Sequence, residues 1–99
     1  MPGRAPQRGG VPQDPLWDLP GWLRDWRLDL GRRIREERLH ANLSQEALGH
    51  RLDVDRNTVA RWELAITSPP LGRLFGIAHE LGIPPARLMP GGPRPPGDE

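Results

Sequence analysis

The chain contains no cysteine, no lysine and no tyrosine among its 99 residues. Without cysteine it can form no disulfide, thiol nucleophile or cysteine-ligated metal cluster. Without lysine, all 14 basic side chains are arginine, which suits bidentate contacts to phosphates and guanine edges, although a GC-rich genome also favours arginine. The formal net charge is only +1, so any role with nucleic acid depends on where the charges lie rather than on their number.

Long apolar runs are also absent. No segment approaches the roughly 18 consecutive apolar residues of a membrane span, and the first residues lack the apolar stretch of a secretory signal. We therefore expect a cytoplasmic protein that does not act in a membrane.

Proline and glycine are concentrated at the two ends of the chain. Residues 1–15 and 90–99 each contain four prolines and three glycines, and such segments bury too little apolar surface to order themselves. We predict disordered tails at 1–15 and 90–99, a tryptophan-rich extension at 16–28 and a folded domain at 29–89. A domain of this size has a small core.

Helical periodicity dominates the sequence between the tails, with no strand pattern and no internal repeat. Ser44 and Asp55 are expected N-caps, as is Asp29, while Asn42 and Gly82 are suited to helix C-termini. The expected helices cover about residues 30–41, 45–52, 56–64, 70–81 and 84–89. The sequence thus predicts an all-α fold, a compact bundle of five short helices.

The segment "LSQEALGHRLDVDRNTVARWE", residues 43–63, joins two of these helices with almost no linker. Gly49 provides the small residue that two steeply crossing helices require, and Val54 fills the turn. The second helix is amphipathic, and its outer face carries Arg56, Asn57 and Arg61. These features meet the physical requirements of a helix-turn-helix.

Together with "SPPLGRLFGIAHELGIPPARLM", this segment resembles the lambda-repressor/Cro-like helix-turn-helix domain of bacterial and phage regulators, also called the xenobiotic-response-element type. The Ser-Gln-Glu opening of the second helix, the Arg-Trp-Glu close of the third and the Ile-Ala…Leu-Gly-Ile segment carry the resemblance over about residues 29–89. The family usually has glycine at the turn, where this chain has Asp53. Aspartate adopts the left-handed conformation at some cost.

The resemblance implies a sequence-specific DNA-binding transcription regulator, with the helix at 56–64 in the major groove of double-stranded DNA. A homodimer on a roughly palindromic operator would place its half-sites about 34–36 Å apart. Base edges would be contacted by Arg56, Asn57 and Arg61. The expected phosphate contacts are Gln45, which would also brace the recognition helix, Thr58, Thr67 and Ser68.

Two charged residues lie where apolar ones are expected. Arg38 falls in the apolar stripe of the helix at 30–41, and Glu63 borders the buried side of the helix at 56–64. Buried charges are nearly always paired, and the family has a buried Arg–Glu pair at the matching positions. We predict that Arg38 and Glu63 form an ion pair that joins the two helices. The outer, solvated face of the helix at 30–41 is expected to carry Arg32, Arg33 and Arg35, countered by Glu36 and Glu37. Arg51 and Arg73, on other helices, are also expected to be solvated.

The sequence contains no catalytic constellation. His40, His50 and His79 lack the spacing of metal ligands, and no hydroxyl residue has a matching histidine and acid. No glycine-rich phosphate loop follows a strand. We therefore expect neither an enzyme nor a bound cofactor or metal.

The extension at 16–28 contains three of the four tryptophans, Trp17, Trp22 and Trp26. Disordered segments have few aromatics, so we expect order here, with a helix over about residues 20–28 and a break or kink near residues 29–31. The segment could pack on its own domain, form a dimer or partner surface, or stay disordered. A rival function follows from the second possibility: an antitoxin-like or adaptor protein that binds a partner protein through these tryptophans.

Overall fold

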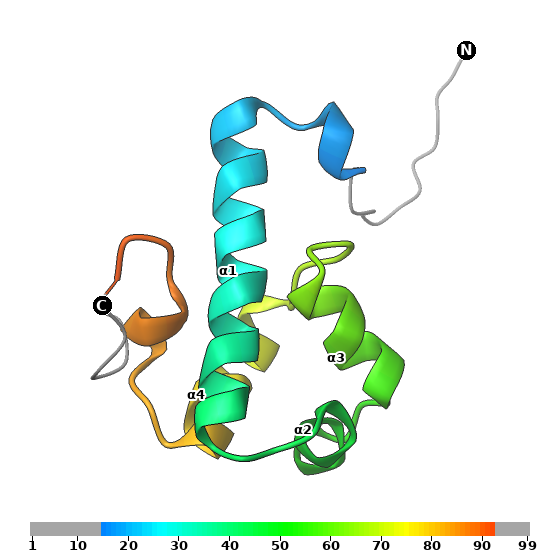
Figure 1. The fold of residues 1–99 in the computed structure, drawn as a ribbon, viewed down its shortest axis with the longest axis vertical. Coiled ribbons are helices and arrows are strands. Elements are labelled where there is room, and N and C mark those ends of the chain that lie inside the picture. Colours follow the sequence, from blue (N-terminus) through cyan, green and yellow to red (C-terminus); the bar gives the residue numbers. More distant parts are fainter. Residues whose placement is uncertain (1–14, 93–99) are drawn as a thin grey trace.

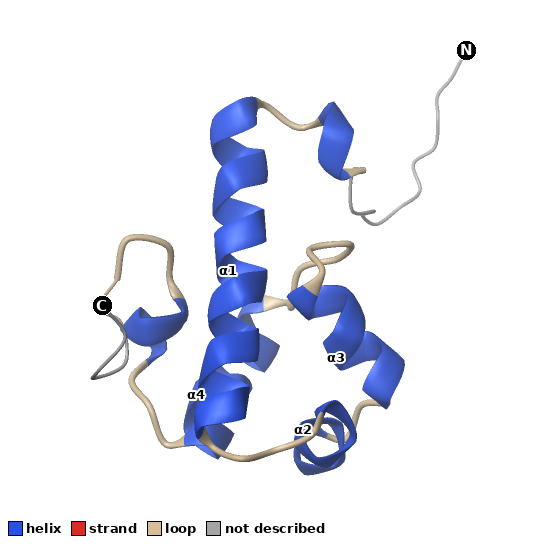
Figure 2. Ribbon diagram, viewed as in Figure 1, coloured by secondary structure: helices blue, strands red, loops and turns tan. Residues whose placement is uncertain are grey.

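The computed structural model describes residues 15–92, and the predicted disorder of the flanking tails falls almost wholly outside these residues. Every regular element within residues 15–92 is helical, which confirms the all-α class (Figure 2). The elements are η2 (Leu16–Asp18), α1 (Gly21–His40), α2 (Gln45–Leu52), α3 (Arg56–Glu63), α4 (Leu71–Leu81) and η3 (Pro85–Leu88).

The expected fifth helix at 84–89 is only the four-residue 3-10 turn η3. Proline is tolerated at the first position of a helix, so Pro85 does not limit η3. Pro90 disfavours helical backbone at the residue before it, and Met89 is extended, so the turn ends there. Leu88 is fully buried nonetheless, so this short turn still closes one side of the core.

The predicted break near residues 29–31 is wrong, because α1 runs without interruption for 20 residues. Asp29 is not an N-cap but bonds to Arg32 and Arg33 one turn further along the same helix. Gly31 serves a close helix contact: a Cβ atom there would lie 2.5 Å from the Glu63 carbonyl oxygen. The glycine therefore permits α1 to approach the end of α3 and does not end the helix.

The core lies where α1, α3, α2 and α4 meet (Figure 1). The long helix α1 packs against α3, and α2 contacts both α3 and α4. The buried apolar side chains are Ile34, Leu48, Leu52, Val59, Trp62, Leu74, Ile77, Ala78 and Leu88. Such a small core makes the remaining polar contacts between helices important for stability.

All four α-helices end in the same way. In each, a left-handed residue lies one or two positions after the last helical residue, and the next backbone N–H donates to the carbonyl five residues earlier, which is the Schellman pattern. The left-handed residues are Asn42, Asp53, Ala65 and Gly82, with φ of 59°, 60°, 63° and 70°. The expectations for Asn42 and Gly82 are therefore met, and only one of the four positions carries the glycine that this conformation favours.

The N-terminal arm, residues 15–28, comprises η2 and the first part of α1, and it projects beyond the body of the molecule (Figure 1). The Arg27 guanidinium ties it to the α3–α4 loop by donating to the carbonyls of Ala65 and Ile66 at 3.1 and 3.2 Å. η2 lies beside the same loop, across a hollow lined by Pro15, Leu16, Trp17 and residues 64–67. The arm is thus ordered, yet none of its residues is buried.

Candidate nucleic-acid interface

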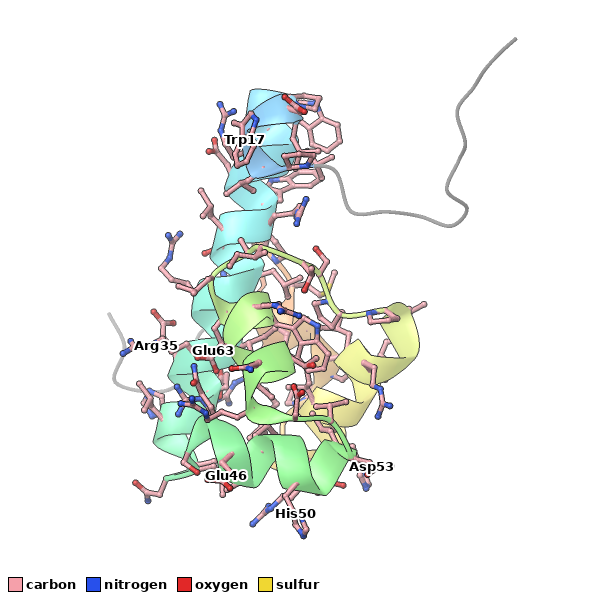
Figure 3. All side chains as sticks on the ribbon, turned by 90° about the vertical axis from the view of Figure 1, so that its right-hand side faces the viewer. Trp17, Arg35, Glu46, His50, Asp53 and Glu63 are labelled. Atoms are coloured by element: carbon pink, nitrogen blue, oxygen red, sulfur yellow. The ribbon has the colours of Figure 1, made fainter. Side chains whose placement is uncertain are left out.

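The turn between α2 and α3 depends on backbone geometry at two residues. A Cβ atom on Gly49 would come within 2.7 Å of the Val54 carbonyl oxygen, so only glycine permits this approach. Asp53 occupies the left-handed position at which the family usually has glycine, and it lies at the exposed end of α2 (Figure 3). The Val54 N–H donates back to the Gly49 carbonyl at 2.9 Å and closes the turn.

Side-chain caps fix where both helices begin. The Ser44 hydroxyl accepts a hydrogen bond from the Ala47 N–H at 2.9 Å, as predicted for α2. Asp55 accepts two bonds from Thr58, from its N–H and its hydroxyl, each at 2.8 Å. These bonds, the backbone one first, lower the pKa of Asp55, and the charge of Arg61 adds to them. The first turn of α3 is therefore anchored by an ionised carboxylate.

The outer face of α3 carries polar groups that the rest of the protein does not use. Arg56, Asn57 and Arg61 are all exposed, and within residues 15–92 no hydrogen bond or ion pair engages their side chains. Arg61 lies close enough to Asp55 to influence it electrostatically but does not bond to it. The helix thus presents two guanidinium groups and one amide to the solvent.

Behind this face, the end of α3 is joined to α1 by the predicted pair of Arg38 and Glu63. The Arg38 guanidinium donates to both carboxylate oxygens of Glu63, at 2.6 and 3.0 Å, and both side chains are buried. Arg38 also donates to the Leu43 carbonyl at 2.8 Å, and Gln45 donates to Glu63 at 3.0 Å. Figure 3 shows Glu63 between the two helices. One carboxylate therefore connects α1, α2 and α3.

The four expected phosphate contacts have different surroundings. Gln45 is half-buried at the start of α2 and already braces α3 through Glu63. The Thr58 hydroxyl donates to Asp55, so it would have to turn away from that carboxylate to donate to a phosphate. Thr67 and Ser68 lie half-buried in the loop that follows α3. Gln45 bonds to Glu63 at the C-terminal end of α3, the end from which this loop leaves, whereas Thr58 lies in the first turn of α3.

A second buried network was not predicted. Arg33 and Glu37, expected on the solvated face of the first helix, are only 5% and 3% exposed. Arg33 donates to Asp29 at 2.9 Å and to the Arg87 carbonyl at 3.2 Å. Arg87 in turn forms a bidentate pair with Glu37, with both bonds at 3.0 Å. The sequence signal was the alternating charge at Asp29, Arg33 and Glu37, one helical turn apart.

Two further arginines are engaged rather than merely solvated. Arg73 of α4 donates to the Leu52 carbonyl at the end of α2. Arg51 reaches the Glu80 carbonyl of α4 at 3.4 Å. Cations are favoured near the free carbonyl groups at helix C-termini, so both side chains link α2 to α4. Arg35, in contrast, is exposed as expected and points away from the helices in Figure 3.

The tryptophans of the N-terminal arm are largely accessible to solvent. Trp17, Trp22 and Trp26 are 78%, 58% and 55% exposed. Trp22 and Trp26 contact each other edge to face, with ring centroids 5.0 Å apart. Only the fourth tryptophan, Trp62 of α3, belongs to the core. The arm therefore does not bury its aromatic rings on its own domain.

Within residues 15–92, no three acidic or histidine side chains gather in a way that would hold a metal ion. The three histidines, His40, His50 and His79, are all exposed. No helix in this part of the chain is long and apolar enough to cross a membrane.

In this arrangement a short, capped helix crosses a second helix closely at a glycine and carries unengaged arginine and asparagine on its outer face. These features define the helix-turn-helix class of DNA-binding folds. A comparison with family models agrees, because the helix-turn-helix model matches residues 34–88. This chain belongs to that family, the lambda-repressor/Cro-like helix-turn-helix domains.

Solved structures with similar folds include two small regulators. The restriction-modification controller protein C.AhdI from Aeromonas hydrophila is 32% identical, with a TM-score of 0.60 over 63% of this chain and 90% of its own. The P22 c2 repressor, solved with a synthetic operator, is 31% identical, with a TM-score of 0.59 over 63% of this chain and 94% of its own.

An enzyme also contains this fold. Hydroxypropylphosphonic acid epoxidase from S. wedmorenis is 27% identical, with a TM-score of 0.62 over 66% of this chain. The match spans only 35% of the epoxidase, so the similarity concerns a part of that protein. No protein of curated function matches the chain.

Proposed function

We propose that this protein is a sequence-specific transcription regulator that places α3 in the major groove of DNA. The observation that carries the proposal is the outer face of α3, where Arg56, Asn57 and Arg61 are exposed and unengaged. Behind them, Glu63 and Asp55 hold the two ends of the same helix in place. A helix that is fixed in the body but leaves its outer donors free is suited to recognise a rigid surface such as a groove.

The side chains suggest which contacts would carry sequence information. Arginine donates two parallel hydrogen bonds to guanine, and the asparagine amide pairs with adenine through one donor and one acceptor. Arg56, Asn57 and Arg61 are therefore the proposed base contacts. Phosphates would be bound at the two ends of α3, by a set that positions the helix without reading sequence, namely Gln45, Thr58, Thr67 and Ser68.

A dimer would extend the recognition site. A helix of eight residues contacts only a few base pairs, so two copies on a roughly palindromic operator, with half-sites about 34–36 Å apart, would provide more specificity. The repressor neighbour supports DNA as the ligand, because that protein was solved with an operator. The protein would act in the cytoplasm.

Selection of bound fragments from random double-stranded DNA tests this function. We expect a pool enriched in one half-site motif, and an affinity for that motif that falls steeply with salt as phosphate-bound counterions are released. Recovery of no motif at low salt would contradict the proposal.

A second function is favoured by one observation, the exposed tryptophans of the N-terminal arm. An antitoxin-like or adaptor protein would use Trp17, Trp22 and Trp26 to bind a partner protein, and its fold would be the same. The near-neutral charge is compatible with this role. Binding that depends on the tryptophans and changes little with salt would favour the adaptor over the DNA-binding regulator.

A further inference from the structure

The N-terminal arm exposes a large apolar surface. Half of its 14 residues are tryptophan or leucine, and none of the 14 is buried. The arm nevertheless forms a turn and a continuous helix rather than a loose segment. An amphipathic or apolar helix is normally stabilised by packing, and this one has little packing within its own chain.

The exposed tryptophan rings supply about half of the area that each partner buries in a standard interface. A whole aromatic side chain covers roughly 150–250 Å², so the exposed fractions of Trp17, Trp22 and Trp26 correspond to about 300–500 Å² of ring surface. The largest apolar patch on a typical monomer is about 300–600 Å² in total, and a standard interface buries about 800 Å² on each partner. The leucines of the arm, of which Leu28 is 37% exposed, add to the aromatic area.

The flanking residues of this chain offer little to cover that surface. Among residues 1–14 the large apolar side chains are Met1 and Val11, and residues 93–99 contain none. Proline, glycine and charged residues make up most of both segments. An equally apolar surface is available on a second copy of the arm.

The charges of the arm also allow two copies to meet. Asp18 and Asp25 are balanced by Arg24 and Arg27, so the segment has no net charge and two arms do not repel each other. A contact about a two-fold axis brings the same surface of both copies together, and edge-to-face aromatic pairs such as Trp22 and Trp26 can extend across such an axis.

We infer that the N-terminal arms of two copies pair across a two-fold axis, with Trp22 and Trp26 at the centre of the contact. The arm is tied to the carbonyls of Ala65 and Ile66, which follow the C-terminal end of α3. Pairing there leaves Arg56 and Asn57, at the opposite end of α3, uncovered. The inference rests on the proposed function, which includes a dimer with one copy on each half-site. It names the surface through which the two copies would associate.

The mass of the full chain in solution tests the inference. The wild type should sediment as a dimer of the 11.1 kDa chain at micromolar concentration, and the double variant Trp22→Glu/Trp26→Glu as a monomer of unchanged helix content, because both rings are exposed. The matched control is Leu71→Glu/Phe75→Glu, a pair one turn apart on α4 that is 64% and 51% exposed. A monomeric wild type, or a dimer that survives the tryptophan changes but not the control changes, would overturn the inference.

An engineered cysteine gives a second, independent readout, since the chain has none of its own. Asp25→Cys, on the exposed helix beside the two rings, should form an intermolecular disulfide, whereas Glu46→Cys on α2 should stay reduced. Equal cross-linking of both, or none at Asp25→Cys, counts against arm pairing. These measurements contain no DNA, so a dimer that selects no operator would refute the proposed function and leave the interface intact.

Discussion

At the scale of single residues, Glu63 of α3 connects three helices through its carboxylate. Its carboxylate accepts from Arg38 of α1 and from Gln45 of α2, while its own backbone ends α3. Removing one partner of a buried pair leaves an uncompensated charge. The orientation of α3 therefore depends on this carboxylate as well as on the core.

We expect Glu63→Ala to lower the free energy of unfolding by about 3–5 kcal/mol, because Arg38 would remain buried without its carboxylate. For a domain of this size that corresponds to a melting temperature lower by more than ~10 °C. Arg32→Ala is the control: its pair with Asp29 is exposed on the arginine side and should contribute under about 1 kcal/mol. Two melting curves that shift equally little would show that the buried pair does not stabilise the fold.

Asp53 gives a prediction of the opposite sign. It is exposed and left-handed, with φ of 60°, and this conformation costs a non-glycine residue about 1–2 kcal/mol. Glycine at this position would remove the cost, but part of the gain would be offset because glycine has more conformational freedom in the unfolded chain. Asp53→Gly should thus stabilise the protein by about 0.5–1 kcal/mol in chemical denaturation. Asp53→Ala keeps the strained conformation and should show no such gain.

At the scale of the elements, α1 and α4 each contain glycine in a helix, but for different reasons. Gly31 lies against the last carbonyls of α3, whereas nothing lies within 4 Å of a Cβ atom at Gly72. Gly31→Ala should separate α1 from α3 and destabilise the protein by more than about 2 kcal/mol, as overpacking does. Gly72→Ala should stabilise it by up to about 1 kcal/mol through helix propensity. If thermal melts show that both alanines stabilise, the close contact at Gly31 is not present.

The start of α3 should depend on pH through Asp55. Hydrogen bonds from Thr58 hold the pKa of Asp55 below its ordinary value of 3.8, so the folded state favours the ionised form. Because the folded pKa is the lower one, this contribution is present above about pH 4 and is lost as the pH falls through the folded pKa.

Asp55→Asn keeps an oxygen that can cap the helix but does not titrate in this range. The melting temperature of the wild type relative to Asp55→Asn should therefore be greatest near neutral pH and decline below about pH 4. A difference that stays constant from pH 7 to pH 2.5 would mean that the charge of Asp55 does not stabilise α3.

The sequence allowed the helix ends to be predicted better than the helix interiors. Ser44, Asp55, Asn42 and Gly82 act locally, on backbone groups within a few residues, and all four behave as expected. The break at Asp29 was predicted from the same local rules and is wrong. There the deciding contacts are distant in the sequence: Gly31 meets the end of α3, and Arg33 bonds to the Arg87 carbonyl of η3.

The exposure of the outer face of α3 could be predicted from helical periodicity, because a helix with Val59 and Trp62 buried must expose Arg56, Asn57 and Arg61. The network of Arg33, Glu37 and Arg87 did not follow, because 50 residues separate Glu37 from Arg87. Only the packing of η3 against α1 brings their charges together. A pattern of one helix cannot show which second segment covers it.

At the scale of the whole molecule, the body and the arm have different roles. The body is a small core with two buried ion-pair networks that fix α3 and η3 to α1. The arm extends the same helix α1 beyond the body and leaves its tryptophans in solvent (Figure 1). The single helix α1 therefore contains the proposed dimer contact at one end and packs against α3, the proposed DNA-binding helix, further along.

This continuity predicts the effect of removing the arm. Deletion of residues 1–27 should leave the core residues intact and convert the dimer into a monomer, with a lower melting temperature because the Arg27 bonds to the α3–α4 loop are lost. Affinity for a full palindromic operator should fall far more than affinity for a single half-site. Equal losses on both DNAs, measured by titration of the two duplexes, would argue that the arm supports the body rather than the dimer.

The central claim is that the outer face of α3 reads base edges. It is tested most directly by titrating the selected operator, and a set of single-base variants of it, with the wild type and with Arg56→Ala, Asn57→Ala and Arg61→Ala. Each alanine should cost about 1–3 kcal/mol on the selected operator and abolish the preference at one base position while leaving the others unchanged. Substitutions that weaken binding to every variant equally would show that these side chains contact only phosphate, and would contradict the account.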